Sequence, residues 1–179
     1  MALTLLVGGA RSGKSELAVQ LAARTGRQVT VLVTAEARDE EMAARIERHR
    51  ARRPAGWSTV ETPREVGRDL VDVPDEDCVV LDCLTLWIAN LLERGDEDEA
   101  IVQAARSAAE IAARRPGPTI VVSNEVGSGI VPIAAVSRRY RDLVGVVNAV
   151  WAEAASHVGL VVAGRVLPLD LVEPEQLLG

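Results

Sequence analysis

Phenylalanine is absent from this chain of 179 residues, and its aromatic side chains are three tryptophans and one tyrosine. A packed interior must therefore be aliphatic, and a hydrophobic content of 48% is enough to build one. No apolar run approaches the length that crosses a bilayer, so we expect no membrane span. The length fits one domain over residues 1–179, with a tail at 166–179 that we expect to be loosely attached.

Cysteine is also scarce, since only Cys78 and Cys83 occur, around the end of an apolar stretch. That placement favours two buried thiols over a disulfide or a metal site. The formal net charge is −6, and no basic surface runs along the chain. Because proteins that bind nucleic-acid backbones carry clustered positive charge, we expect no nucleic-acid partner. These features together predict a cytoplasmic protein.

The chain has 20 Lys and Arg residues, and all of them are arginines except Lys14. Lys14 belongs to the octet Gly8-Gly9-Ala10-Arg11-Ser12-Gly13-Lys14-Ser15, which matches the phosphate-binding loop G-x-x-x-x-G-K-[ST] at every fixed position. A codon bias toward arginine would explain the arginines but not the position of the one lysine. A compact ammonium fits between two phosphates where a planar guanidinium does not. The octet therefore predicts a nucleotide site, with the Ser15 hydroxyl on Mg²⁺.

Apolar stretches alternate with amphipathic ones along the chain. The stretches that we expect as strands are 3–7, 29–33, 57–61, 78–82, 119–123 and 158–163. Helical patterns lie between them, the clearest at 39–53 and 133–155. Strands that alternate with helices imply right-handed βαβ units. We therefore predict an α/β fold, namely a P-loop NTPase (RecA-like) three-layer sandwich with a mostly parallel sheet.

Asp82 ends the strand expected at 78–82. In a phosphate-loop protein such an acid can hold Mg²⁺ through water or contact the ribose of the nucleotide. A strand-terminal aspartate can also simply cap the next helix. Because the octet is present, we favour a role for Asp82 in the nucleotide site over helix capping. We predict Ser15 and Asp82 as the metal ligands.

His49 lies on the expected helix 39–53, on the same stripe as Met42 and Ile46. A lone histidine on an apolar stripe is usually a core residue. The same stretch, however, carries the arginines Arg45, Arg48, Arg50, Arg52 and Arg53. Such a cluster suits a polyphosphate, and its charge disfavours the imidazolium. Since a neutral imidazole can attack phosphorus, His49 is either a core residue or a nucleophile.

Several segments together resemble the bifunctional adenosylcobinamide kinase/adenosylcobinamide-phosphate guanylyltransferase family. They are 8–15, 39–50, 53–54, 57–61, 81–87, 90–92, 122–132 and 138–148, and they span almost the whole chain in order. The resemblance implies that ATP or GTP phosphorylates adenosylcobinamide. It also implies that GMP is then transferred from GTP to the new phosphate, giving adenosylcobinamide-GDP and pyrophosphate. A homotrimer is a further implication.

The resemblance also implies roles for single residues. The family's nucleophile falls on His49, which would carry GMP as a phosphoramidate, while Lys14 would act in both reactions. The residues that would line the nucleotide are the octet 8–15, Thr34, Ala35, Glu36, Arg50, Ala51, Arg52, Arg53, Glu61 and Asp82. Glu61 either accepts two hydrogen bonds from the edge of guanine or is a solvated acid at a strand end.

Two other functions stay open on the residues alone. An ordinary P-loop kinase of a small metabolite would leave His49 structural. A nucleotide switch would bind nucleotide without acting on adenosylcobinamide. The segment 124–129 follows a strand at the edge where open α/β sheets bind ligands, and it is either part of the corrinoid or nucleotide pocket or a glycine turn.

Overall fold

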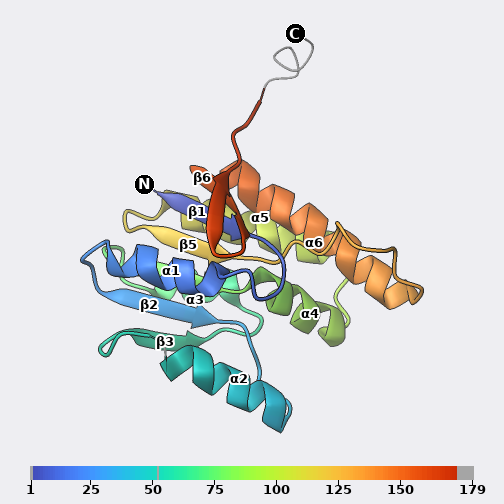
Figure 1. Ribbon diagram of the computed structural model, residues 1–179, viewed down its shortest axis with the longest axis horizontal. Coiled ribbons are helices and arrows are strands. Elements are labelled where there is room, and N and C mark those ends of the chain that lie inside the picture. The colour runs from blue at the N-terminus through green and yellow to red at the C-terminus, as the bar shows by residue number, and fades with distance from the viewer. Residues whose placement is uncertain (1, 52, 173–179) are drawn as a thin grey trace.

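The structure is a computed structural model that describes residues 2–51 and 53–172 (Figure 1). Within them, one sheet runs in the order β3-β2-β4-β5-β1-β6-β7. Its strands are β1 (Leu3–Val7), β2 (Val29–Val33), β3 (Ser58–Glu61), β4 (Cys78–Asp82), β5 (Thr119–Val122), β6 (His157–Val162) and β7 (Arg165–Pro168). All of these pairings are parallel except that of β6 with β7. The predicted mostly parallel sheet is confirmed.

Helices cover both faces of this sheet. They are α1 (Lys14–Ala23), α2 (Glu40–Ala51), α3 (Val66–Asp72), α4 (Leu84–Arg94), α5 (Asp98–Arg114) and α6 (Ala135–Ala154). The helices α3 to α6 pack on one face, and α1 packs on the other through Ala18 and Ala22. Figure 1 shows α2 beside β3, at the end of the sheet away from β7. The layers are those of the three-layer sandwich that the sequence predicts.

The core is aliphatic, as the absence of phenylalanine requires. Leucine, valine, isoleucine and alanine fill both faces of the sheet, and Trp87 and Trp151 are the large aromatic members, each 1% exposed or less. Cys78 and Cys83 are buried free thiols, as predicted. Over the described residues, none of the helices combines the length and the apolar character that a membrane span requires.

The end of the chain differs from the expectation. Residues from Val166 were expected to be loose, but Val166 and Leu167 pair with Val161 and Leu160 in an antiparallel hairpin. The hairpin turn consists of Ala163 and Gly164, with φ of 51° and 73°, and such positive values suit the tight turns that join twisted strands. The expectation is therefore wrong for residues 166–168, and residues 173–179 lie outside the described part. The short helix α3 was also not expected.

Candidate nucleotide and phosphoryl-transfer site

The phosphate-binding loop makes the turn from β1 into α1. At Gly8, a Cβ atom would lie 2.3 Å from the carbonyl oxygen of Val161. Gly13 has a φ of 101° and stands at the N-cap of α1. Both positions therefore require glycine. The N–H of Gly164 donates to the carbonyl of Ser12 at 2.8 Å, which holds the loop against the β6–β7 turn.

The ammonium of Lys14 lies back over this loop. Its Nζ donates to the carbonyls of Gly8 at 2.9 Å and Gly9 at 2.6 Å, and to Oγ of Ser12 at 3.3 Å. The side chain is 6% exposed. The N-terminus of α1 adds its positive dipole end at the same place. Together they form a cradle for an anion such as a phosphate group.

Asp82 connects the loop to the helix that carries His49. Its Oδ1 accepts a hydrogen bond from the Ser15 hydroxyl at 3.4 Å, and its Oδ2 lies 3.8 Å from Nδ1 of His49. These three residues come from α1, α2 and β4, far apart in the sequence. The fold thus brings together three of the residues that the sequence singled out.

A cavity of about 530 Å³ lies beside these residues, between α1 and the last turn of α2. Its lining consists of Ser15, Glu16, Val19, Gln20, Val31, His49, Arg53, Val80 and Asp82. Apolar side chains from β2 and β4 stand next to a few charged groups. That combination is typical of a small-molecule site.

Among the described residues of the arginine cluster, Arg53 lines this cavity. Its Nη1 donates to Oγ1 of Thr59 in β3 at 3.2 Å. Burial lowers the pKa of the Arg53 guanidinium; the charge of Asp82 opposes this effect and that of Arg50 adds to it. Because the ordinary pKa of arginine is so high, Arg53 stays cationic near neutral pH. Arg50 and Ala51 are exposed, and the predicted residue Arg52 lies outside the described part of the chain.

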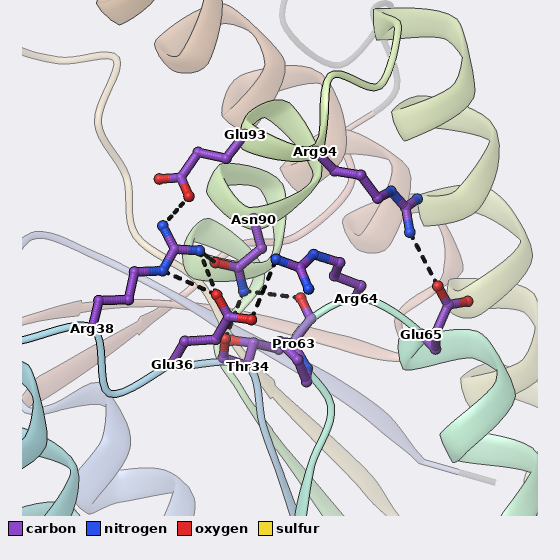
Figure 2. A network of polar contacts seen from close by, with 9 residues as sticks. All are labelled: Thr34, Glu36, Arg38, Pro63, Arg64, Glu65, Asn90, Glu93 and Arg94. Atoms are coloured by element: carbon purple, nitrogen blue, oxygen red, sulfur yellow. Dashed lines mark hydrogen bonds and ion pairs between the residues drawn. The ribbon is translucent and has the colours of Figure 1, made fainter.

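The residues after β2 that we predicted to line the nucleotide bind other parts of the protein. The Thr34 hydroxyl is buried, where it donates to the carbonyl of Cys83 at 2.7 Å and accepts from the Cys83 N–H at 2.9 Å. Glu36 pairs with Arg38 and Arg64 (Figure 2). Ala35 is half-buried, and Glu61 is exposed at the end of β3. None of Thr34, Ala35, Glu36 and Glu61 is among the described residues of the cavity wall, so their contact with nucleotide stays a prediction.

Asn90 of α4 organises the network around Glu36 (Figure 2). Its Nδ2 donates to the carbonyls of Thr34 at 2.8 Å and Pro63 at 2.9 Å. Its Oδ1 accepts from Nη2 of Arg38 at 2.7 Å, and Arg38 also pairs with Glu93. The segment that leads from β2 into α2 is therefore tied to α4. This fixes the point from which the helix of His49 starts.

Cys83 follows Asp82 through a cis peptide bond and is a further nucleophilic side chain near the site. Burial and the neighbouring charge of Asp82 raise the pKa of its thiol. Its Sγ lies 3.1 Å from Oγ1 of Thr85. Because the thiolate is the reactive form, a buried thiol with a raised pKa is inert near neutral pH.

The Ser15 hydroxyl and the Asp82 carboxylate lie together and offer oxygen ligands to a metal. Mg²⁺ commonly takes one or two protein oxygens and completes its shell with water and phosphate. In the described part of the chain, no group of three or more His, Cys, Asp or Glu residues could hold a metal by itself. The two residues thus fit a Mg²⁺ ion that arrives with a nucleotide.

Sequence reasoning missed most of the cavity wall. The missed residues are Glu16, Val19, Gln20, Val31 and Val80. A signal existed, because positions 16, 19 and 20 share one face of a helix. Val80 lies two residues before Asp82 in β4, so both side chains are on the same face of the sheet. Val31 of β2 pairs with Val80 and so lies beside it on that face.

Comparison with known proteins identifies the family. A family model described as cobinamide kinase / cobinamide phosphate guanyltransferase matches residues 4–169. The chain belongs to this family. The bifunctional adenosylcobalamin biosynthesis protein CobP of Pseudomonas aeruginosa is 44% identical over 166 residues, covering 92% of this chain and 95% of the relative. CobU of Escherichia coli, with the same description, is 41% identical over 175 residues and covers 90% and 96%.

Solved structures confirm the RecA-like P-loop fold. The RadB recombinase aligns with a TM-score of 0.50 and 19% identity, over 89% of this chain and 73% of that one. An ATPase from the type III secretion system of pathogenic bacteria aligns with a TM-score of 0.54 and 13% identity, over 89% and 50%. At these identities the likeness concerns the fold alone. The assignment to the bifunctional enzyme family rests on the sequence relatives.

Proposed function

We propose that this member of the family phosphorylates adenosylcobinamide with ATP or GTP and then transfers GMP from GTP through an intermediate on His49. The products of the second reaction are adenosylcobinamide-GDP and pyrophosphate. The observation that carries the proposal is the position of His49 against Asp82 and beside Ser15, on a cavity that adjoins the phosphate loop. This position places an imidazole next to the acid that also contacts the phosphate loop.

In the kinase reaction, Lys14 exchanges its bonds to the loop carbonyls for phosphate oxygens. The loop amides and this ammonium stabilise charge on the transferring γ-phosphoryl group. Ser15 and Asp82 would hold Mg²⁺, which supplies neutralising charge at the phosphates. The oxygen of the acceptor hydroxyl bonds to the γ-phosphorus as the bond to the departing nucleoside diphosphate breaks.

In the guanylyl transfer, an imidazole nitrogen of His49 attacks the α-phosphorus of GTP and pyrophosphate leaves. The phosphate of adenosylcobinamide phosphate then attacks the same phosphorus and releases the histidine. Arg53, in the same cavity, neutralises charge on the phosphates. The covalent intermediate divides one difficult displacement into two easier ones.

Incubation with GTP that carries ³²P in the α-phosphate tests the proposal, and the chain offers a matched control. The only other histidine, His157, lies exposed in β6. We expect an acid-labile, base-stable label on the wild type and on His157→Ala but none on His49→Ala. His49→Ala should still phosphorylate adenosylcobinamide. An unlabelled wild type would favour the ordinary kinase, and failure to act on adenosylcobinamide at all would favour the nucleotide switch.

We also propose that the enzyme is a homotrimer in the cytoplasm, on the strength of the family resemblance. Apolar side chains are exposed in the loop before α6, among them Ile130 at 97% and Ile133 at 98%. Exposed apolar patches commonly mark contact surfaces between proteins. Sedimentation equilibrium should give the mass of three chains, and a monomer would overturn this part of the proposal.

A further inference from the structure

The two ring nitrogens of His49 stand in different surroundings. Nδ1 is the nitrogen that faces Oδ2 of Asp82, at 3.8 Å. Because the two nitrogens of an imidazole diverge, Nε2 is directed away from that carboxylate. The side chain of His49 is 35% exposed and that of Asp82 is 18% exposed, and both line the cavity. One nitrogen is thus held near an acid, and the other is left for the phosphorus.

Asp82 is the fixed partner in this pair. It ends β4 in the middle of the sheet, in register with Val33 on one side and Val122 on the other. Its Oδ1 is already engaged by the Ser15 hydroxyl, which leaves Oδ2 to the histidine. His49 lies on the last turn of α2, and Figure 1 shows this helix at the edge of the fold. The sheet therefore fixes the place of Asp82, whose Oδ2 faces the imidazole ring.

We infer that Asp82 is a positioning residue that keeps the proton of His49 on Nδ1, so that GMP is carried on Nε2. The inference rests on the function proposed above. The proton of an imidazole resides on the nitrogen whose hydrogen bond favours it, and a carboxylate favours N–H. The observed 3.8 Å is longer than a hydrogen bond, and catalytic hydrogen bonds are often long in a protein without substrate and tighten when substrate binds.

The electrons and protons balance in this scheme. The lone pair of Nε2 forms the bond to the α-phosphorus, and the electron pair of the broken P–O bond leaves with pyrophosphate. The proton stays on Nδ1, and the positive charge on the ring lies against the Asp82 carboxylate. When the phosphate of the acceptor attacks, the N–P bond breaks and its pair returns to Nε2.

The attachment site is measured directly by nuclear magnetic resonance. Protein with ¹⁵N-labelled histidine is reacted with GTP and kept alkaline, and coupling to phosphorus identifies the bonded nitrogen. We expect the nucleotide on Nε2, and attachment to Nδ1 overturns the inference while leaving the proposed function intact. A wild type that forms no adduct overturns both.

Two variants separate positioning from a role at the metal. Ser15→Ala and Asp82→Asn each remove a predicted Mg²⁺ ligand, but it is the Asp82 carboxylate that lies 3.8 Å from Nδ1 of His49. In Asp82→Asn, an amide that keeps its oxygen toward Ser15 turns its N–H₂ toward Nδ1 and favours the wrong tautomer. We expect Ser15→Ala to leave any residual adduct on Nε2. Relative to Ser15→Ala, Asp82→Asn should form adduct about 10- to 100-fold more slowly and lose the preference for Nε2.

One outcome of the comparison between Ser15→Ala and Asp82→Asn would contradict the inference. If Asp82→Asn forms its adduct wholly on Nε2, and as fast as Ser15→Ala does, then Asp82 acts only at the metal and the inference is wrong. Binding of a fluorescent GTP analogue and circular dichroism show whether each variant is folded and holds nucleotide. If a variant fails this check, the inference is decided by which nitrogen of His49 carries GMP in the wild type.

Discussion

The hydroxyl of Ser123 donates a hydrogen bond of 2.5 Å to Oδ1 of Asn148. Nδ2 of the same asparagine donates to the carbonyl of Asn124 at 3.0 Å. The next residue, Glu125, donates its N–H to the carbonyl of Gly8 at 3.0 Å. One amide from α6 therefore positions the end of β5 beside the phosphate loop. Ser123 and Asn148 are both buried, so no water replaces these bonds readily.

Replacing Asn148 should therefore destabilise the fold. Asn148→Leu keeps the branched shape of the side chain but leaves the Ser123 hydroxyl and the Asn124 carbonyl without this partner. The Ser123 hydroxyl is buried and the Asn124 carbonyl is half-buried. Since an unpaired buried group costs about 1–3 kcal/mol, we expect a loss of at least about 1 kcal/mol in the free energy of unfolding. Guanidinium unfolding measures it. Val146→Ala, at a half-exposed position of the same helix, should change stability by less than about 1 kcal/mol, and equal effects would contradict this account.

The two neighbouring glycines of the phosphate loop should respond differently to alanine. In Gly8→Ala the new methyl would lie 2.3 Å from the carbonyl oxygen of Val161, whereas at Gly9 a methyl meets nothing within 4 Å. We expect Gly8→Ala to move the loop or β6, with a lower melting temperature and loss of GTP binding. Gly9→Ala should melt close to the wild type. Matching melting curves for the two variants would show that the loop relaxes more freely than its contacts indicate.

Lys14 should be needed for both reactions. Lys14→Ala removes the charge at the phosphates, and Lys14→Arg places a broad guanidinium where a buried ammonium bonds to Gly8 and Gly9. We expect both variants to lose about 100-fold or more in the kinase rate and in labelling of His49. Arg24→Ala, at the exposed end of α1, is the matched control and should keep both activities. Normal labelling in Lys14→Ala would show that the α-phosphate chemistry does not use the lysine.

Local sequence signals single out three residues that the structure brings together, namely Ser15, His49 and Asp82. The octet defines the loop, the apolar stretch of β4 ends at Asp82, and the helical stripe carries His49. Parallel strands end at one edge, and that geometry brings Ser15 and Asp82 into contact. Local patterns and fold topology together therefore locate the phosphate side of the site.

The remaining parts depend on partners that are distant in the sequence. Nothing in the stretch after β2 shows that Asn90 and Arg64 will engage Thr34 and Glu36. The β6–β7 hairpin is hidden for a different reason, since Ala163 takes a positive φ that is typical of Gly or Asn. The local sequence therefore predicts neither the partners of Thr34 and Glu36 nor the turn at Ala163.

The single tyrosine gives a pH-dependent test of packing near the site. Burial raises the pKa of Tyr140 to about 12, and negative charge at Cys83 acts in the same direction. Since the unfolded value is about 10, the folded chain holds this proton more tightly. The resulting contribution to stability is complete below about pH 10 and is lost as the pH rises toward about 12.

Because the chain has one tyrosine, phenolate absorbance reports on Tyr140 alone. We expect the native protein to ionise near pH 12 and the protein in guanidinium near pH 10, so the two curves should be well separated. In Tyr140→Phe, the free energy of unfolding should fall less between these pH values than in the wild type. Ionisation of the native protein near pH 10, with its fold intact by circular dichroism, would mean that the phenol reaches water and that α6 packs less closely on Thr85 than its hydrogen bond indicates.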